Sequence, residues 1–132
     1  MERKNKGDLL HRSIIYKILS SLLYLIAYPI LFIITKLWLG LKVEGRENLN
    51  KVGDEYITVA NHINMIDCAM IVLSIFPRIP YFLTLQSNLE IPFIKYLVML
   101  FRGIPIPRNI LGKEKMVNTI DGLLKKGEVV GI

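Results

Sequence analysis

An uncharged apolar run near the amino terminus constrains this chain most. Residues 18–35 read ILSSLLYLIAYPILFIIT, and the continuation to Leu41 approaches the ~20 residues that cross a hydrocarbon core. A secretory signal peptide would carry a shorter apolar stretch followed by a small-residue cleavage site, whereas this run continues through Trp38 into more chain. At 52% hydrophobic residues, the 132-residue chain has more apolar surface than one soluble domain needs. We therefore expect residues 1–41 to be a basic leader and membrane anchor, retained in the mature protein.

Two arrangements of this anchor fit the sequence. Both flanks of the run are basic, which disfavours a single crossing and favours entry and exit on the same face of the membrane. Pro29 removes an amide donor, so it could divide the run into two short helices within one leaflet. The alternative is a single membrane span with a kink at the proline. The expected location is the cytoplasmic face of the cell membrane.

Residues 42–132 have the pattern of an α/β domain. Short β-branched or aromatic runs predict strands, and longer apolar runs with turn formers predict helices. The expected strands are 56–60, 81–85 and 128–132, with an extended edge segment at 104–107. The expected helices are 68–76, 91–101 and 113–126. Strands that alternate with helices favour a mainly parallel sheet, here in the amino-terminal part of a larger domain.

The most informative residues follow the first of these strands. His62 stands at the expected carboxyl end of that strand, and Asp67 stands five positions later at the start of a helix. A neutral imidazole can take a proton from a hydroxyl, and a carboxylate on its other nitrogen stabilises the imidazolium. This pairing requires the intervening loop to fold back over the first helical turn, because positions five apart do not share a helix face. Asn64 is the expected N-cap that would permit such a loop.

A structural reading of the same residues is also open. The spacing His-x-x-x-x-Asp occurs often by chance, and Asp67 could be a capping carboxylate only. Cys68 is the single cysteine, so no intrachain disulfide can form. Its apolar surroundings are typical of a small core residue rather than of a nucleophile.

Several blocks together resemble one enzyme family. Residues 61–67, NHINMID, are similar to the NHxxxxD motif of the glycerolipid acyltransferases, and residues 43–49 look like that family's lead-in. Downstream, residues 91–93 and 103–108 stand where its second block belongs. The chain therefore resembles the 1-acylglycerol-3-phosphate (lysophosphatidic acid) acyltransferases.

The resemblance implies a reaction and a set of site residues. His62, held by Asp67, would deprotonate the acceptor hydroxyl for attack on an acyl thioester, and Arg108 would bind the acceptor's phosphate. Asn61 and Gly103 join the expected substrate-binding residues, whereas Arg102 is a weaker phosphate candidate. The donor would be acyl-CoA or acyl carrier protein and the acceptor a lysophospholipid beside membrane lipids. No metal, bound cofactor or nucleic acid is expected. Arg108 could instead be an ordinary surface arginine.

One block of the family pattern is missing. Family members continue past a turn such as residues 126–128 into a strand and a Phe-Pro-Glu-Gly-Thr-Arg block, whereas this sequence stops at Ile132. We therefore expect a carboxyl-terminally truncated member that is inactive or weakly active alone. The alternative class is a non-catalytic membrane-bound remnant that binds anionic lipid or a partner through its basic flanks.

Overall fold

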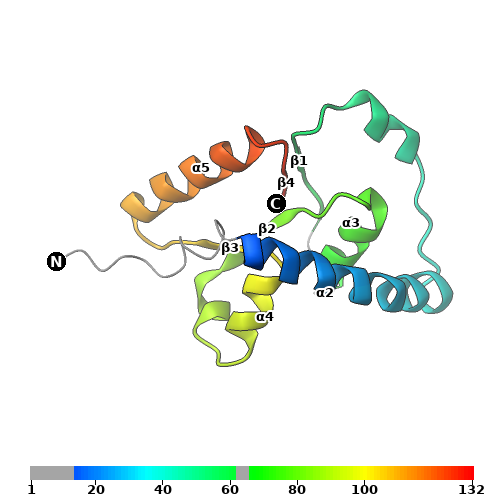
Figure 1. Cartoon of the computed structure of the whole chain (residues 1–132), viewed down its shortest axis with the longest axis horizontal. Helices are drawn as coiled ribbons and strands as arrows, with labels where there is room; N and C mark the ends of the chain where they lie inside the picture. Colours follow the sequence, from blue (N-terminus) through cyan, green and yellow to red (C-terminus); the bar gives the residue numbers. More distant parts are fainter. Residues whose placement is uncertain (1–13, 62–65) are drawn as a thin grey trace.

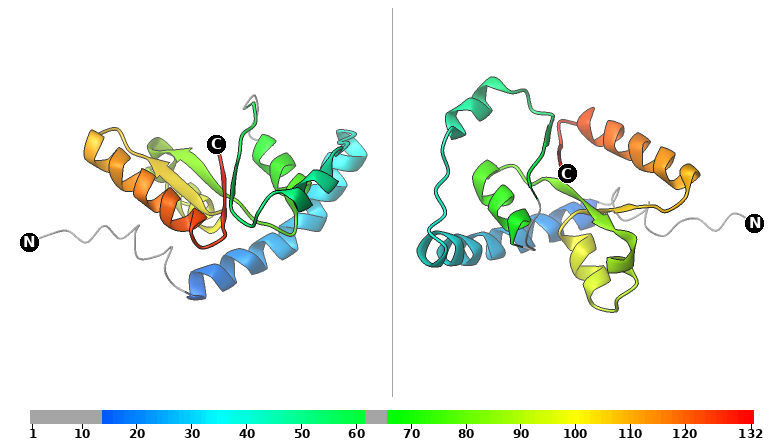
Figure 2. Two further views of the ribbon diagram at one scale, coloured as in Figure 1. Left: turned by 90° about the horizontal axis from the view of Figure 1, so that it is seen from above. Right: turned by 180° about the vertical axis from the view of Figure 1, so that it is seen from behind.

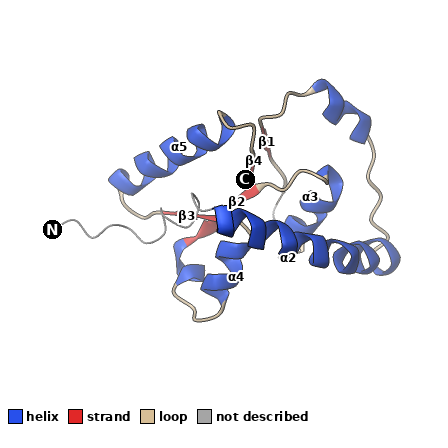
Figure 3. Ribbon diagram, viewed as in Figure 1, coloured by secondary structure: helices blue, strands red, loops and turns tan. Residues whose placement is uncertain are grey.

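The protein folds around a four-stranded parallel sheet with helices on both faces (Figures 1 and 3). The computed structural model describes residues 14–61 and 66–132. The strand order is β1-β4-β2-β3, and all three neighbouring pairs are parallel. The strands are β1 (Tyr56–Thr58), β2 (Tyr81–Leu85), β3 (Gly103–Ile106) and β4 (Val129–Gly131). The expected α/β class with a parallel sheet is confirmed.

Connection direction explains which face each helix covers. The chain moves one way across the sheet from β1 to β2 to β3, and it returns from β3 to β4. Because parallel crossovers are right-handed, α3 and α4 lie on one face and α5 lies on the other. The helices after the first are α3 (Asp67–Ile75), α4 (Ile94–Leu100) and α5 (Ile110–Leu124), with 3₁₀ turns η2 (Arg46–Lys51) and η3 (Gln86–Leu89).

The main apolar core lies between α5 and the two central strands. Tyr81 of β2 and Val130 of β4 are fully buried, and Leu123 of α5 packs against them. The strand expected at 56–60 is shorter than predicted and is not buried, since Ile57 is 47% exposed and Val59 is 75% exposed. The physical reason is position: β1 is an edge strand, whereas the short β4 has neighbours on both sides.

The amino-terminal apolar run forms one continuous helix. α2 spans Ile14–Ile33 and is followed directly by a π-helical turn, η1 (Ile34–Trp38). Pro29 lies inside α2, so the run forms one continuous helix and the prediction of two short helices is wrong. In η1 the Thr35 hydroxyl donates to the Leu31 carbonyl at 2.7 Å, which satisfies one acceptor where the helical pattern changes.

α2 packs against α3 and α4, and its carboxyl-terminal end extends past them (Figure 2). The Tyr16 hydroxyl donates to the Met99 carbonyl, and the Tyr24 hydroxyl donates to the Phe101 carbonyl at 3.1 Å. Tyr24 also meets the Phe101 ring edge-on, with the ring centroids 5.3 Å apart. Three positions spaced by four residues, Tyr16, Ser20 and Tyr24, are the buried ones in this helix.

The opposite face of α2 is apolar and exposed. Leu22, Leu25 and Ile26 are each more than half exposed. α2 and η1 together, Ile14–Trp38, form one helical segment that is long and apolar enough to cross a membrane by length and composition, with a mean hydropathy of 2.2. By those criteria the segment can serve as an anchor.

Three helix boundaries differ from the sequence-based expectation. α3 begins at Asp67 with Ile66 at the N-cap position, and Asn64, the expected N-cap, lies outside the described residues. α4 begins at Ile94, three residues later than predicted. α5 begins at Ile110, three residues earlier, because the Asn109 side chain accepts a hydrogen bond from the Gly112 amide at 2.8 Å and caps the helix.

Candidate active site

A groove of about 300 Å³ lies at the carboxyl end of β1, between that strand's exit and α3. The strand exit contributes Asn61, and the first turn of α3 contributes Asp67. Carboxyl ends of parallel strands are where α/β sheets form their sites. The groove is lined by Thr58, Val59, Ala60, Asn61, Asp67, Met70, Ile71, Ser74 and Ile75. His62, the expected base, lies outside the described residues.

The described residues on either side of positions 62–65 lie at the same groove. The Ala60 amide donates to the Ile132 carbonyl at 3.3 Å, which keeps this segment beside β4 beyond the end of β1. The helix then begins with the Met70 amide donating to the Ile66 carbonyl at 3.0 Å. Asn61 and Asp67 thus line one groove although six positions separate them. Asp67 lies at the amino end of α3, where the helix dipole favours a carboxylate.

Cys68 follows Asp67 and is half-buried. Burial raises the pKa of its thiol, and the negative charge of Asp67 raises it further. The neutral thiol is therefore favoured over the nucleophilic thiolate. This environment agrees with the interpretation of Cys68 as a small core residue.

Alkylation kinetics should report that environment. Free cysteine has a pKa of about 8.5, and its alkylation by iodoacetamide reaches half the maximal rate near that pH. We expect Cys68 to reach its half-maximal rate at a higher pH, because its pKa is raised. The single cysteine makes the reading unambiguous, and free cysteine under the same conditions is the control. A half-maximal rate at or below that of free cysteine would contradict the assigned environment.

Arg108 lies at the same carboxyl edge of the sheet as the groove, but beyond the opposite edge strand. It follows β3 and directly precedes Asn109, the N-cap of α5. Its side chain is exposed and makes no hydrogen bond or ion pair with any side chain in the described ranges. Three strand spacings separate β3 from β1, or about 14 Å between backbones. Arg108 and Asn61 are thus on the same edge without being in contact.

Gly103 occupies a different place. It is buried as the first residue of β3, at the amino edge of the sheet, away from the groove. A Cβ at this position would lie 2.5 Å from Val98 Cγ1 and 2.9 Å from the Val98 carbonyl oxygen. The missing side chain therefore lets α4 pack closely on β3.

A pair of alanine substitutions tests that packing. We expect Gly103→Ala to destabilise the fold by about 1–3 kcal/mol, because the backbone of Val98 cannot move aside cheaply. The matched control is Gly122→Ala in α5, where an added Cβ meets nothing within 4 Å. That substitution should stabilise the helix by about 0.5–1 kcal/mol. Chemical denaturation in detergent measures both, and equal effects would refute the packing role of Gly103.

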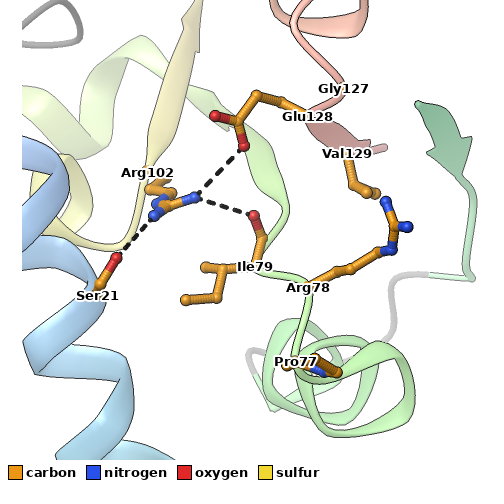
Figure 4. A pocket seen from close by; sticks show the side chains of 8 residues that line it. All are labelled: Ser21, Pro77, Arg78, Ile79, Arg102, Gly127, Glu128 and Val129. Atoms are coloured by element: carbon orange, nitrogen blue, oxygen red, sulfur yellow. Dashed lines mark hydrogen bonds and ion pairs between the residues drawn. The ribbon is translucent and has the colours of Figure 1, made fainter. Parts of the chain in front are cut away.

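Arg102 is a buried structural residue in this fold. It is 6% exposed and lines a second pocket, of about 260 Å³, at the amino ends of the strands (Figure 4). Its guanidinium donates to Ser20 Oγ at 3.0 Å, Ser21 Oγ at 3.2 Å and the Ile79 carbonyl at 3.2 Å. Glu128 Oε2 lies 3.8 Å from Nη1. These contacts join α2 to the amino edge of the sheet, whereas the groove lies at the carboxyl edge.

Sequence reasoning did not identify this role, although a signal was present. Tyr16, Ser20 and Tyr24 recur every fourth residue within an otherwise apolar helix, which places their hydroxyls on one face. In a helix surrounded by lipid, such a polar stripe indicates a docking face.

The comparisons with known proteins agree with this geometry. The family model described as Acyltransferase matches residues 40–132, more than half of the chain. The fold and groove define an α/β protein with a site at its strand ends, and the chain belongs to the acyltransferase family. The match begins next to Leu41 and includes the groove residues, Gly103 and Arg108. Neither the curated proteins nor the solved structures give a match.

Among the described residues, no group of three or more His, Cys, Asp and Glu side chains is placed to hold a metal ion.

Proposed function

We propose that this chain carries the catalytic motif of a membrane-associated acyltransferase. It would transfer a fatty acyl group from acyl-CoA or acyl carrier protein to the hydroxyl of a lysophospholipid, with 1-acylglycerol 3-phosphate as the proposed acceptor. The observation that carries the proposal is the convergence of Asn61 and Asp67 on one groove, within a family match that spans residues 40–132. His62, the proposed base, directly follows Asn61 in the sequence.

The proposed chemistry uses one base and one orienting carboxylate. His62 takes the proton of the acceptor hydroxyl as its oxygen attacks the thioester carbonyl. Asp67 holds the imidazole and stabilises the imidazolium. The tetrahedral intermediate then expels the donor thiolate, which recovers the proton from His62. The products are an ester and a free thiol, and the base is regenerated.

Arg108 is the proposed phosphate ligand. It is exposed, it precedes α5, and the first backbone amides of that helix add positive potential at the same place. The strand order puts about 14 Å of backbone separation between this end of β3 and β1. An acceptor that reaches both sites therefore requires the long Arg108 side chain to extend along the strand ends toward the groove.

The proposed anchor is residues 1–41, and the polarity of α2 supports its contact with lipid. The hydroxyls of Tyr16, Ser20 and Tyr24 point to the protein, whereas the apolar side chains point away. A helix packed on a water-soluble domain has the reverse arrangement, with its apolar face inward. The exposed face of α2 is thus suited to a hydrocarbon environment.

We further propose that α2 lies within one leaflet, on the cytoplasmic face where acyl-CoA and acyl carrier protein occur. α2 contacts both α3 and α4, so the helix is docked on the domain. A perpendicular crossing would carry Arg102 and Glu128 into the hydrocarbon core, at a high desolvation cost. An in-plane helix leaves the charged groups near the membrane surface.

An acceptor comparison tests the proposed phosphate ligand. We expect Arg108→Ala to raise the KM for 1-acylglycerol 3-phosphate by roughly 10- to 100-fold, as loss of a charge-assisted contact of ~1.5–3 kcal/mol implies. Acyl transfer to an uncharged monoacylglycerol should change little. Lys113→Ala, an exposed cation one turn into α5, is the matched control.

The assay should use two forms of the protein. One is the 132-residue chain, and the other is the same chain extended after Ile132 by a family carboxyl-terminal part with the Phe-Pro-Glu-Gly-Thr-Arg block. Acyl transfer by either form supports the proposed reaction. If neither form transfers acyl groups while both bind anionic vesicles, the proposed acyl transfer is refuted. The result would then support the alternative, a non-catalytic lipid-binding protein. An equal effect of Arg108→Ala on both acceptors would refute a phosphate-specific role.

A further inference from the structure

A second apolar surface lies beside α2. It consists of exposed side chains at the amino end of α4 and in the turn before it. The exposed fractions are 46% for Ile91, 89% for Phe93, 40% for Ile94, 68% for Tyr96 and 50% for Leu97. We call these five residues the α4 knob. Lys95 is the only charged residue among positions 91–101, and it is also exposed.

Phe93 is exposed and its backbone conformation is strained. Its φ of 67° and ψ of −49° lie outside the regions that L-residues ordinarily adopt. The Ile94 amide donates to the Pro92 carbonyl at 2.9 Å, so Phe93 is the central residue of a strained γ-turn. Strain at an exposed aromatic residue is a pointer to function, because nothing in the core requires it.

The α4 knob belongs to the same rigid unit as the exposed face of α2. The carboxyl half of α4 is tied to α2 through the Tyr16 contact to Met99 and the Tyr24 contacts to Phe101. Figure 1 shows α4 beside α2 and directed away from α5. Any surface that α2 enters is therefore adjacent to the knob.

We propose that the α4 knob inserts into the membrane interface beside α2, as a second lipid contact on an anionic bilayer. The inference rests on the proposed contact of α2 with lipid. Tyr96 has the amphipathic ring found at headgroup depth, and Lys95 with the formal net charge of +6 favours anionic headgroups. An apolar tip with one cation is typical of interfacial elements.

Insertion of the knob has a consequence for the site. The knob follows η3, which comes directly after β2 and contacts β3, so it lies towards the carboxyl edge of the sheet. That edge also carries Arg108. Two contacts, α2 and the knob, would fix the tilt of the domain and bring this edge to the depth of lipid headgroups. A lysophospholipid could then reach the site without leaving the membrane.

Quenching by brominated lipid tests the proposal on the full chain. Single cysteines are introduced at Phe93, Ile26 and Val117 in a Cys68→Ser background, labelled with an environment-sensitive fluorophore and reconstituted with phosphatidylcholine and phosphatidylglycerol vesicles. Ile26 reports the outer face of α2, and Val117 is an exposed apolar position on α5, on the other face of the sheet. We expect quenching at Phe93→Cys to exceed that at Val117→Cys roughly threefold or more, matching a depth of ~5–10 Å.

The outcomes separate the two contacts. Quenching at Ile26→Cys without quenching at Phe93→Cys overturns the knob and leaves the α2 contact in place. No quenching at either position refutes both. Equal quenching at all three positions indicates non-specific adsorption and overturns the proposal. A spectral change at Phe93→Cys that depends on protein concentration and not on vesicles assigns the knob to self-association instead.

Discussion

His62→Ala is expected to lower the rate of acyl transfer by about 10²–10⁴-fold in whichever form of the chain is active. Without the imidazole, the acceptor hydroxyl must attack with its proton still bound. Residues 61–67 contain no second histidine that could replace His62. Asp67→Asn should have a smaller effect, because the amide can still orient the imidazole but does not stabilise its charged form. The expected order of rates is therefore wild type, Asp67→Asn, His62→Ala.

The chain supplies its own control for this substitution. His11 is the other histidine, and it lies in the basic leader without a partner pattern around it. His11→Ala should leave the rate within a factor of about two, while binding to anionic vesicles is retained in both variants. Initial rates with labelled acyl-CoA measure the effect. A His62→Ala variant that transfers acyl groups like the His11→Ala control would refute the base assignment.

The sequence predicted elements best where local pattern alone decides the structure. The strand Tyr81–Leu85 is found at its predicted bounds, because an aromatic and β-branched run between turn formers has few alternatives. The start of α5 was predicted too late, although Asn109 followed by Gly112 offered a capping signal. Capping depends on one side-chain contact, which hydrophobic periodicity does not detect.

Pairing between distant segments could not be predicted from local pattern. β4 inserts between β1 and β2, so β1 becomes an edge strand and β3 the opposite edge. This order separates Arg108 from the groove, whereas the linear motif suggested a compact set of site residues. Asn61 and Asp67, by contrast, line one groove, and their closeness in the sequence favours this, because they flank one strand-to-helix connection.

Arg102 shows why a residue type alone does not assign a role. Arg102 directly precedes β3 and is a phosphate candidate by residue type, yet its side chain is buried in the protein. The Arg102 guanidinium donates to the Ser20 and Ser21 hydroxyls, and its Cζ atom lies 5.2 Å from the centroid of the Tyr81 ring. Those partners come from segments more than twenty residues away, which no local pattern contains.

Arg102→Met is therefore expected to destabilise the fold by about 3–5 kcal/mol and to loosen α2. The substitution leaves the buried Ser20 hydroxyl and the Ile79 carbonyl without their donor. Denaturation in detergent measures the stability, and faster proteolysis after Lys36 should report the loosened helix. Arg78→Met is the matched control, because Arg78 lines the same pocket and pairs with Asp54 at the surface, where such pairs contribute about 0–1 kcal/mol.

A double-mutant cycle separates docking from a general loss of packing. If Arg102 holds α2 through Ser20, then Ser20→Ala should cost little more in the Arg102→Met background, with a coupling of about 1 kcal/mol or more. Additive effects would mean that the two residues stabilise the fold independently. A strong coupling would instead establish that α2 is docked through its polar stripe, which is the arrangement that leaves its apolar face to the membrane.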